Sequence, residues 1–165
     1  YGNQAAGMMK YLGDKEGGLE KLKGKKIVHL YHDSAYGKEP FAVFEAYAKQ
    51  YGFELIKLAV PHPGNEQQSQ WLQIRQAKPD YVILWGWGVM NATALKTAQR
   101  NGYPREKVLG VWWAGSEEDV IPAGDARWFR RQRLYHHDLQ HAGQLSAARR
   151  DQEEGLRRRQ GQPGG

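Results

Sequence analysis

The residue types of a hydrolytic triad occur side by side in the sequence, at His32, Asp33 and Ser34. A nucleophilic serine needs a base and an orienting acid that meet it in space, whereas neighbours at one strand end point apart. The Gly-x-Ser-x-Gly elbow that exposes the nucleophile of α/β hydrolases is also missing from the sequence. An α/β hydrolase that uses Ser34 is therefore kept only as an alternative, and we expect no enzymatic activity.

Two further groups contain residue types that bind metal ions. Residues 117–119 are adjacent carboxylates, which more often form a solvated turn than a metal site. His136, His137 and His141 are spaced for adventitious nickel or zinc binding, not for a dedicated site. The sequence also lacks the glycine-rich loops that hold nucleotide phosphates. We therefore expect neither a metal nor a cofactor.

The most distinctive side chains are aromatic. Trp85 and Trp87 alternate with glycines directly after a short apolar run at residues 81–84. Such a run is typical of a strand buried on both faces, and ligands of open α/β sheets bind outside the carboxyl ends of such strands. The two indoles could cap the sheet or form a platform for an apolar or aromatic small molecule. Tyr36 offers a ring and a hydroxyl at an earlier strand end, or it packs on the next helix.

The elements that must position these residues alternate along the chain. Apolar runs flanked by turn residues predict strands at residues 26–31, 53–60, 81–84 and 108–113. Apolar residues at helical spacing predict helices before and between these strands. The helices are expected at residues 4–12, at residues 41–51, in a segment capped by Asn65, and from residue 91 to about residue 100. The alternation predicts an α/β fold with a mainly parallel sheet flanked by helices. The loops after the strands, at residues 33–37, 61–65, 85–90 and 113–118, are expected on the ligand side.

Composition divides the 165 residues into two segments. Residues 1–126 hold 12 Lys and 3 Arg against 14 acidic residues, whereas residues 127–165 hold 9 Arg against 4 acidic residues and no Lys. The second segment, called the tail below, also lacks Val, Ile, Met, Thr and Asn. One alternative is a nucleic-acid-binding α/β module that uses this basic tail. The absence of cysteine excludes disulfides, and no apolar run approaches the length of a membrane span.

Several short motifs occur in an order that resembles one known family. They lie at residues 25–28, 32–37, 61–65, 78–82, 94–98, 101–102 and 111–113. Together they resemble the second lobe of type I periplasmic binding proteins, the leucine/isoleucine/valine-binding family of ABC-transporter substrate-binding proteins. The resemblance covers about residues 1–126, which we expect to form an incomplete lobe. In that family two α/β lobes close on a small solute and deliver it to the permease subunits in the periplasm.

The resemblance also implies which residues contact the solute. Tyr36 and Trp87 would touch it, and an acidic residue near Glu117 would meet an amine. The remaining expected contacts are polar at Ser34 and Asn65 and aromatic at Trp113. The indole-rich neighbourhood favours an aromatic or larger apolar acid or amide over a plain aliphatic amino acid. Because the first lobe is absent, this chain would hold only one half of the cleft and bind weakly alone.

The tail has a different explanation within this family. One choice of codons for residues 151–164, read one base later, encodes Ile-Lys-Lys-Lys-Val-Tyr-Asp-Ala-Gly-Lys-Gly-Asn-Leu. That sequence resembles an amphipathic helix of the family that ends in a glycine-rich stop. We therefore interpret residues 127–165 as a low-order, basic tail that arises from a shifted reading frame.

Overall fold

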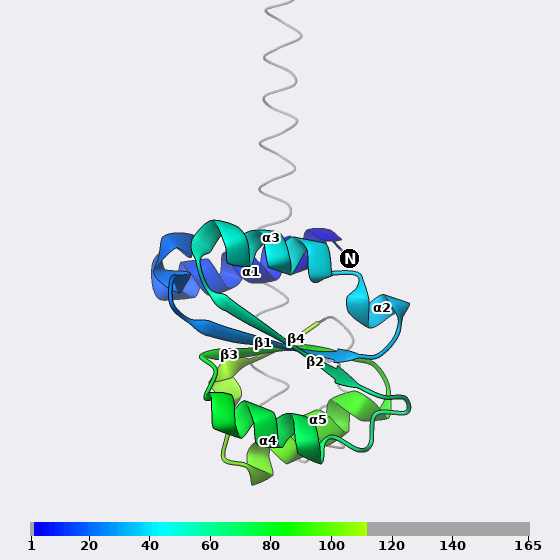
Figure 1. The fold of residues 1–165 in the computed structure, drawn as a ribbon. Coiled ribbons are helices and arrows are strands. Elements are labelled where there is room, and N and C mark those ends of the chain that lie inside the picture. The colour runs from blue at the N-terminus through cyan, green and yellow to red at the C-terminus, as the bar shows by residue number, and fades with distance from the viewer. Residues whose placement is uncertain (1, 112–165) are drawn as a thin grey trace, which may run out of the picture.

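The computed structural model describes residues 2–111, and these residues form a layered α/β unit (Figure 1). Four parallel strands lie in the order β2-β1-β3-β4. Helices α1 and α3 lie on one face of the sheet, and α4 and α5 cover the other (Figure 1). The elements are α1 (Gly2–Glu16), η1 (Leu19–Leu22), β1 (Lys26–His32), α2 (Ala35–Lys38), α3 (Phe41–Tyr51), β2 (Glu54–Val60), α4 (Gln68–Ala77), β3 (Tyr81–Trp85), α5 (Val89–Arg100), η2 (Arg105–Lys107) and β4 (Val108–Gly110). The predicted fold class is confirmed.

The central strands form the core because helices cover both faces of the sheet. All five residues of β3 are buried, and so are six of the seven residues of β1. The edge strand β2 is only partly buried. Parallel strands covered on both faces read as continuous apolar runs, which is why residues 81–84 were recognisable from sequence. Within residues 2–111, no helix is long and apolar enough to cross a membrane.

Two of the helix boundaries that differ from the prediction involve residues with a clear local role. Helix α1 continues past Gly13 to Glu16, and Gly13 packs closely against η1, since a Cβ there would lie 2.7 Å from Leu19 Cγ. The helix ends instead before Gly17 and Gly18, which both have positive φ. Helix α4 begins at Gln68, so the prediction that Asn65 caps it was wrong.

Candidate functional site

The parallel strands bring the loops of the predicted site to one edge of the sheet. Strands β1, β2, β3 and β4 end at His32, Val60, Trp85 and Gly110. Because the strands run the same way, their following loops share this carboxyl edge. The described segments there are residues 33–37, which include the start of α2, and the loops at residues 61–67 and 86–88. Trp113 and Glu117, which the sequence placed in the fourth loop, lie outside the described residues.

The first loop is held by a cap and by a glycine. Ser34 is the N-cap of α2, and its Oγ accepts a hydrogen bond from the backbone N–H of Gly37 at 3.3 Å. A Cβ on Gly37 would lie 1.8 Å from the backbone oxygen of His32, so only glycine fits. This close approach brings the start of α2 against the end of β1. The ring of Tyr36 is half-buried, with its centroid 6.2 Å from that of Trp85.

The same loop carries a solvated ion pair and no assembled triad. Asp33 Oδ1 lies 2.8 Å from Lys38 Nζ, and hydrogen bonding to Asp33 raises the pKa of Lys38. Ser34 Oγ is engaged in the helix cap, while Nε2 of His32 faces another histidine. The three residues of a hydrolytic triad are therefore adjacent in sequence without forming a catalytic relay.

The second loop is fastened to the start of α5 by a residue that sequence reasoning missed. Gln67 is buried, and its Nε2 donates hydrogen bonds to the backbone oxygens of Gly64 at 2.7 Å and Met90 at 2.8 Å. Its Oε1 accepts one from Trp71 Nε1 at 3.1 Å. Gly64 has φ 99°, and a Cβ there would lie 2.5 Å from Met90 Cβ. Asn65, the predicted ligand contact, is exposed beside this locked segment.

Three rings meet at the carboxyl edge, one from the last residue of β1 and two from the loops after β2 and β3. His32 Nε2 lies 3.3 Å from His62 Nδ1. The ring centroid of Trp87 lies 5.5 Å from that of His32 and 6.3 Å from that of His62. We call His32, His62 and Trp87 the edge cluster. His32 is only 4% exposed, whereas Trp87 is 51% exposed, so the indole lies over a buried imidazole and presents surface to solvent. Burial, then the neighbouring His62, lowers the pKa of His32, opposed by Asp33.

The two tryptophans lie in different environments. Trp85 is fully buried and packs its ring edge-on against Phe44 and His29, at centroid distances of 5.9 and 6.1 Å. It therefore belongs to the core. Trp87 lies two residues further along, beyond the end of β3, and is one of three large apolar side chains that are exposed in the described part.

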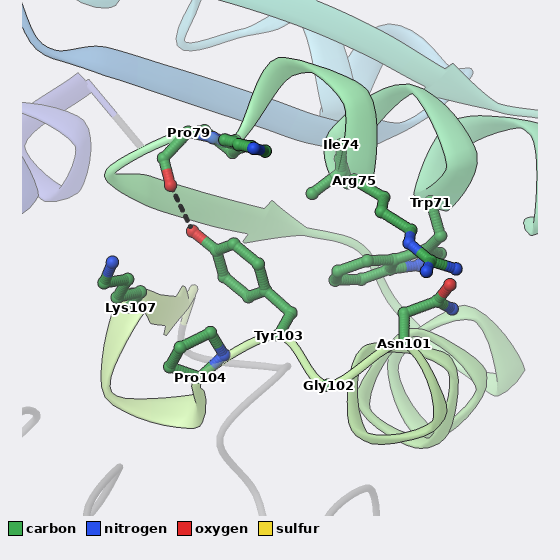
Figure 2. Close-up of a pocket in the computed structure, with 10 residues that line it drawn as sticks. Trp71, Ile74, Arg75, Pro79, Asn101, Gly102, Tyr103, Pro104 and Lys107 are labelled. Carbon is green, nitrogen blue, oxygen red and sulfur yellow. Dashed lines mark hydrogen bonds between the residues drawn. The ribbon is translucent and has the colours of Figure 1, made fainter.

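A cavity of about 220 Å³ lies away from this edge (Figure 2). It is lined by the carboxyl end of α4, by the segment after α5 and by Lys107. Tyr103 forms one wall, and its hydroxyl donates to the backbone oxygen of Pro79 at 3.0 Å. Burial raises the pKa of Tyr103. Because the cavity sits near the amino ends of β3 and β4, it is not the solute site that the fold predicts.

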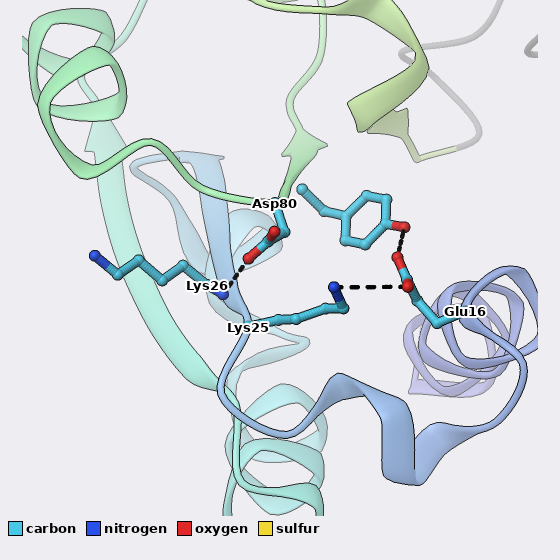
Figure 3. A network of polar contacts seen from close by, with 5 residues as sticks. Glu16, Lys25, Lys26 and Asp80 are labelled. Carbon is cyan, nitrogen blue, oxygen red and sulfur yellow. Dashed lines mark hydrogen bonds and ion pairs between the residues drawn. The ribbon is translucent and has the colours of Figure 1, made fainter.

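A polar network secures the amino edge of the sheet (Figure 3). Lys25 Nζ lies 3.6 Å from Glu16 Oε2, and Tyr81 donates a hydrogen bond to Glu16 Oε1. The backbone N–H of Lys26 donates to Asp80 Oδ2 at 2.9 Å. These contacts join the end of α1 to the starts of β1 and β3. No cluster of three or more metal-ligating side chains occurs within residues 2–111.

A family model described as "Periplasmic binding protein" matches residues 1–130. The chain belongs to the type I periplasmic binding proteins. This is a family of transport binding proteins and not of enzymes, in agreement with the prediction. No curated protein sequence gives a significant match.

Solved structures of this family share the fold. An ABC transporter permease from the Pseudomonas fluorescens group is 50% identical over 75% of this chain and 30% of its own, with a TM-score of 0.74. A branched chain amino acid ABC transporter from Thermus thermophilus with bound valine is 24% identical over 76% of this chain and 31% of its own, with a TM-score of 0.63. A solute binding protein from R. palustris in complex with benzoate is 24% identical over 74% of this chain and 33% of its own, with a TM-score of 0.55. This periplasmic binding protein chain thus spans 30–33% of the length of these three proteins.

Proposed function

We propose that this chain supplies one lobe of an ABC-transporter substrate-binding protein that captures a small organic solute. The observation that carries the proposal is the edge cluster, in which a half-exposed indole stands over two imidazoles at the ligand edge of a periplasmic-binding-protein lobe. An exposed aromatic face of this kind suits an apolar or aromatic group. In the intact protein, hinge closure over the solute would expel water and hand the solute to the permease subunits in the periplasm.

The fold supports particular contacts on this lobe. Trp87 offers its exposed ring, and Tyr36 adds a half-buried ring from the segment after β1. Ser34 and Asn65 add polar groups at the same edge, although Ser34 Oγ is already engaged by Gly37. Trp113 and Glu117 would complete the contacts from the next loop. The relatives described above with bound valine and with benzoate suggest an amino acid or an aromatic acid as the solute.

The domain division is part of the proposal. Residues 1–126 form the incomplete lobe, and residues 127–165 form a separate basic tail. The family match ends at residue 130, close to the point where the composition changes. A nucleic-acid-binding function would rest entirely on the tail, and nothing in the described residues favours it.

The half-cleft argument can be tested with a chimera. The first lobe of the half-identical Pseudomonas relative would be joined to residues 1–126 of this chain, and leucine, phenylalanine and benzoate would be titrated calorimetrically. We expect at least one solute to bind the chimera about a hundredfold more tightly than it binds the 165-residue chain, because two lobes enclose most of a ligand's surface. Equal micromolar binding by the chain alone would contradict the half-cleft argument.

The contribution of the edge cluster can be measured in the same chimera. Trp87→Ala should weaken solute binding about tenfold or more, as expected for an aromatic contact near the centre of an interface. Leu72→Ala is the matched control, because Leu72 is 54% exposed but lies on α4 away from the carboxyl edge. Unchanged binding after Trp87→Ala would remove the edge cluster from the site.

A further inference from the structure

The hydrogen bond between His32 and His62 determines whether the other ring nitrogen of His62, Nε2, donates or accepts a hydrogen bond. His32 Nε2 and His62 Nδ1 share one hydrogen bond, so one ring donates and the other accepts. His32 Nδ1 is fully buried and has no hydrogen-bond partner within residues 2–111. If His62 donated, a neutral His32 would carry its proton on this buried Nδ1. A buried N–H without an acceptor is rarer and more costly than an unused lone pair.

The favourable arrangement therefore places the proton of His32 on Nε2, from which it is donated to His62 Nδ1. A neutral His62 must then carry its own proton on Nε2. His62 is an exposed residue, and its Nε2 has no partner among the described residues. If His62 gains a second proton, Nε2 still carries a hydrogen. In both protonation states the free nitrogen of His62 is a donor, so a solute that displaces the water around it must offer an acceptor in its place.

The other groups at this edge leave that donor available. Asp33 is paired with Lys38 at 2.8 Å, so its carboxylate already has a donor. Glu66 is exposed and forms no ion pair within residues 2–111. The third loop, at residues 86–88, contains no charged residue. Glu66 is thus the competing feature, because it would favour a cationic solute.

We infer that His62 is a specificity-determining residue that selects a carboxylate-bearing aromatic solute, whose ring stacks on Trp87. The inference rests on the proposed function and adds the ligand class and the polar anchor on this lobe. His32 acts as the positioning residue, since it orients the ring of His62 from the buried end of β1. A carboxylate accepts from a histidine N–H more strongly than a neutral amide does. An ammonium has only donors to offer, so it cannot satisfy this nitrogen.

Three benzene derivatives of similar size distinguish an anionic, a neutral and a cationic solute: benzoate, benzamide and benzylamine. Each is titrated into the 165-residue chain while NMR follows the ring signals of His62 and Trp87. We expect benzoate to bind about tenfold more tightly than the other two, in line with a hydrogen bond to a charged acceptor. His62→Phe keeps a ring beside Trp87 and should reduce benzoate binding to the level of benzamide. His62→Gln restores an N–H donor and should recover part of the preference.

His136→Phe is the matched control, because it makes the same replacement in the tail and should leave all three affinities unchanged. Equal binding of benzoate and benzamide would overturn the carboxylate anchor while leaving aromatic solute capture intact. A preference for benzylamine would assign selectivity to Glu66 and also overturn it. Because the chain alone holds one half of the cleft, the probes are added up to saturating, millimolar concentration, and if none of them then perturbs the edge cluster, both the inference and the assignment of this edge to solute capture fail.

Discussion

The buried histidine of β1 should make the stability of this lobe depend on pH. His29 is fully buried, and neither ring nitrogen has a hydrogen-bond partner within residues 2–111. Aromatic rings surround it, with Phe44 at a centroid distance of 5.0 Å and Tyr31 at 5.1 Å. Burial, and secondarily the charge of Lys57, lowers the pKa of His29 from 6.5 to about 3. The folded lobe therefore cannot accept a proton that the unfolded chain binds readily.

The sign and size of the effect follow from linkage. Between pH 6.5 and about pH 3 the unfolded chain carries more protons at this position, so the free energy of unfolding falls as the pH falls. With these two pKa values, His29 removes about 2 kcal/mol of stability between pH 8 and pH 5. By pH 4 the loss is about 3 kcal/mol. Above about pH 7.5 its contribution is constant, because both states are neutral there. His32, whose pKa is also lowered, acts in the same direction.

Replacing His29 by leucine removes this titration while keeping an apolar side chain in the core. Urea unfolding of the chain and of His29→Leu would be followed by circular dichroism from pH 8 to pH 5. The variant should lose about 2 kcal/mol less than the parent over that interval, whatever its absolute stability at pH 8. His136→Leu, in the tail, is the control. An identical pH dependence in parent and His29→Leu, or an NMR titration of His29 near its ordinary pKa in the folded chain, would refute the reasoning.

Two further predictions concern residues that hold the loops in place, and a third concerns the origin of the tail. Gln67→Leu should lower the free energy of unfolding by about 2–4 kcal/mol in urea titrations, since it leaves three buried polar partners unpaired. The exposed Gln73→Leu should change it by less than about 0.5 kcal/mol. Gly37→Ala should cost about 3 kcal/mol or more, whereas Gly2→Ala, which meets no atom within 4 Å, should have little effect. Sequencing the gene should reveal codons for residues 127–165 that encode family sequence one base later, and codons that forbid this reading would refute the frame-shift interpretation.

Local patterns in the sequence were enough to predict the sheet and most of its helices. Residues 81–84 form a continuous apolar run because β3 is buried on both faces, and Gly52 ends α3 with φ 75° as a C-cap glycine should. The start of α4 could not be predicted in the same way. Asn65 is a better capping residue than Gln67, but the buried hydrogen bonds of Gln67 to Gly64 and Met90 decide where the helix begins.

The candidate site was harder to predict, because its parts are distant in sequence. His32 and His62 are 30 residues apart, and their ring contact depends on the pairing of β1 with β2 and on the path of the following loop. Sequence reasoning predicted a ligand contact at Trp87, from its place after a buried strand and from the family resemblance, but it assigned no role to His62. A histidine between two prolines gives no local signal of a partner. Only the register of the sheet brings the two rings together.

The edge cluster is held in place before any solute arrives. Gly37 fits against His32 without room for a Cβ, Gln67 joins the second loop to Met90, and Gly64 contacts Met90 closely. Binding therefore need not supply the free energy of ordering these loops, which would otherwise weaken the affinity. It follows that a variant such as Gln67→Leu should weaken solute capture without touching the solute, by freeing the loop that carries His62. In the proposed two-lobed protein, closure would then come from the hinge between the lobes and not from movement of these loops.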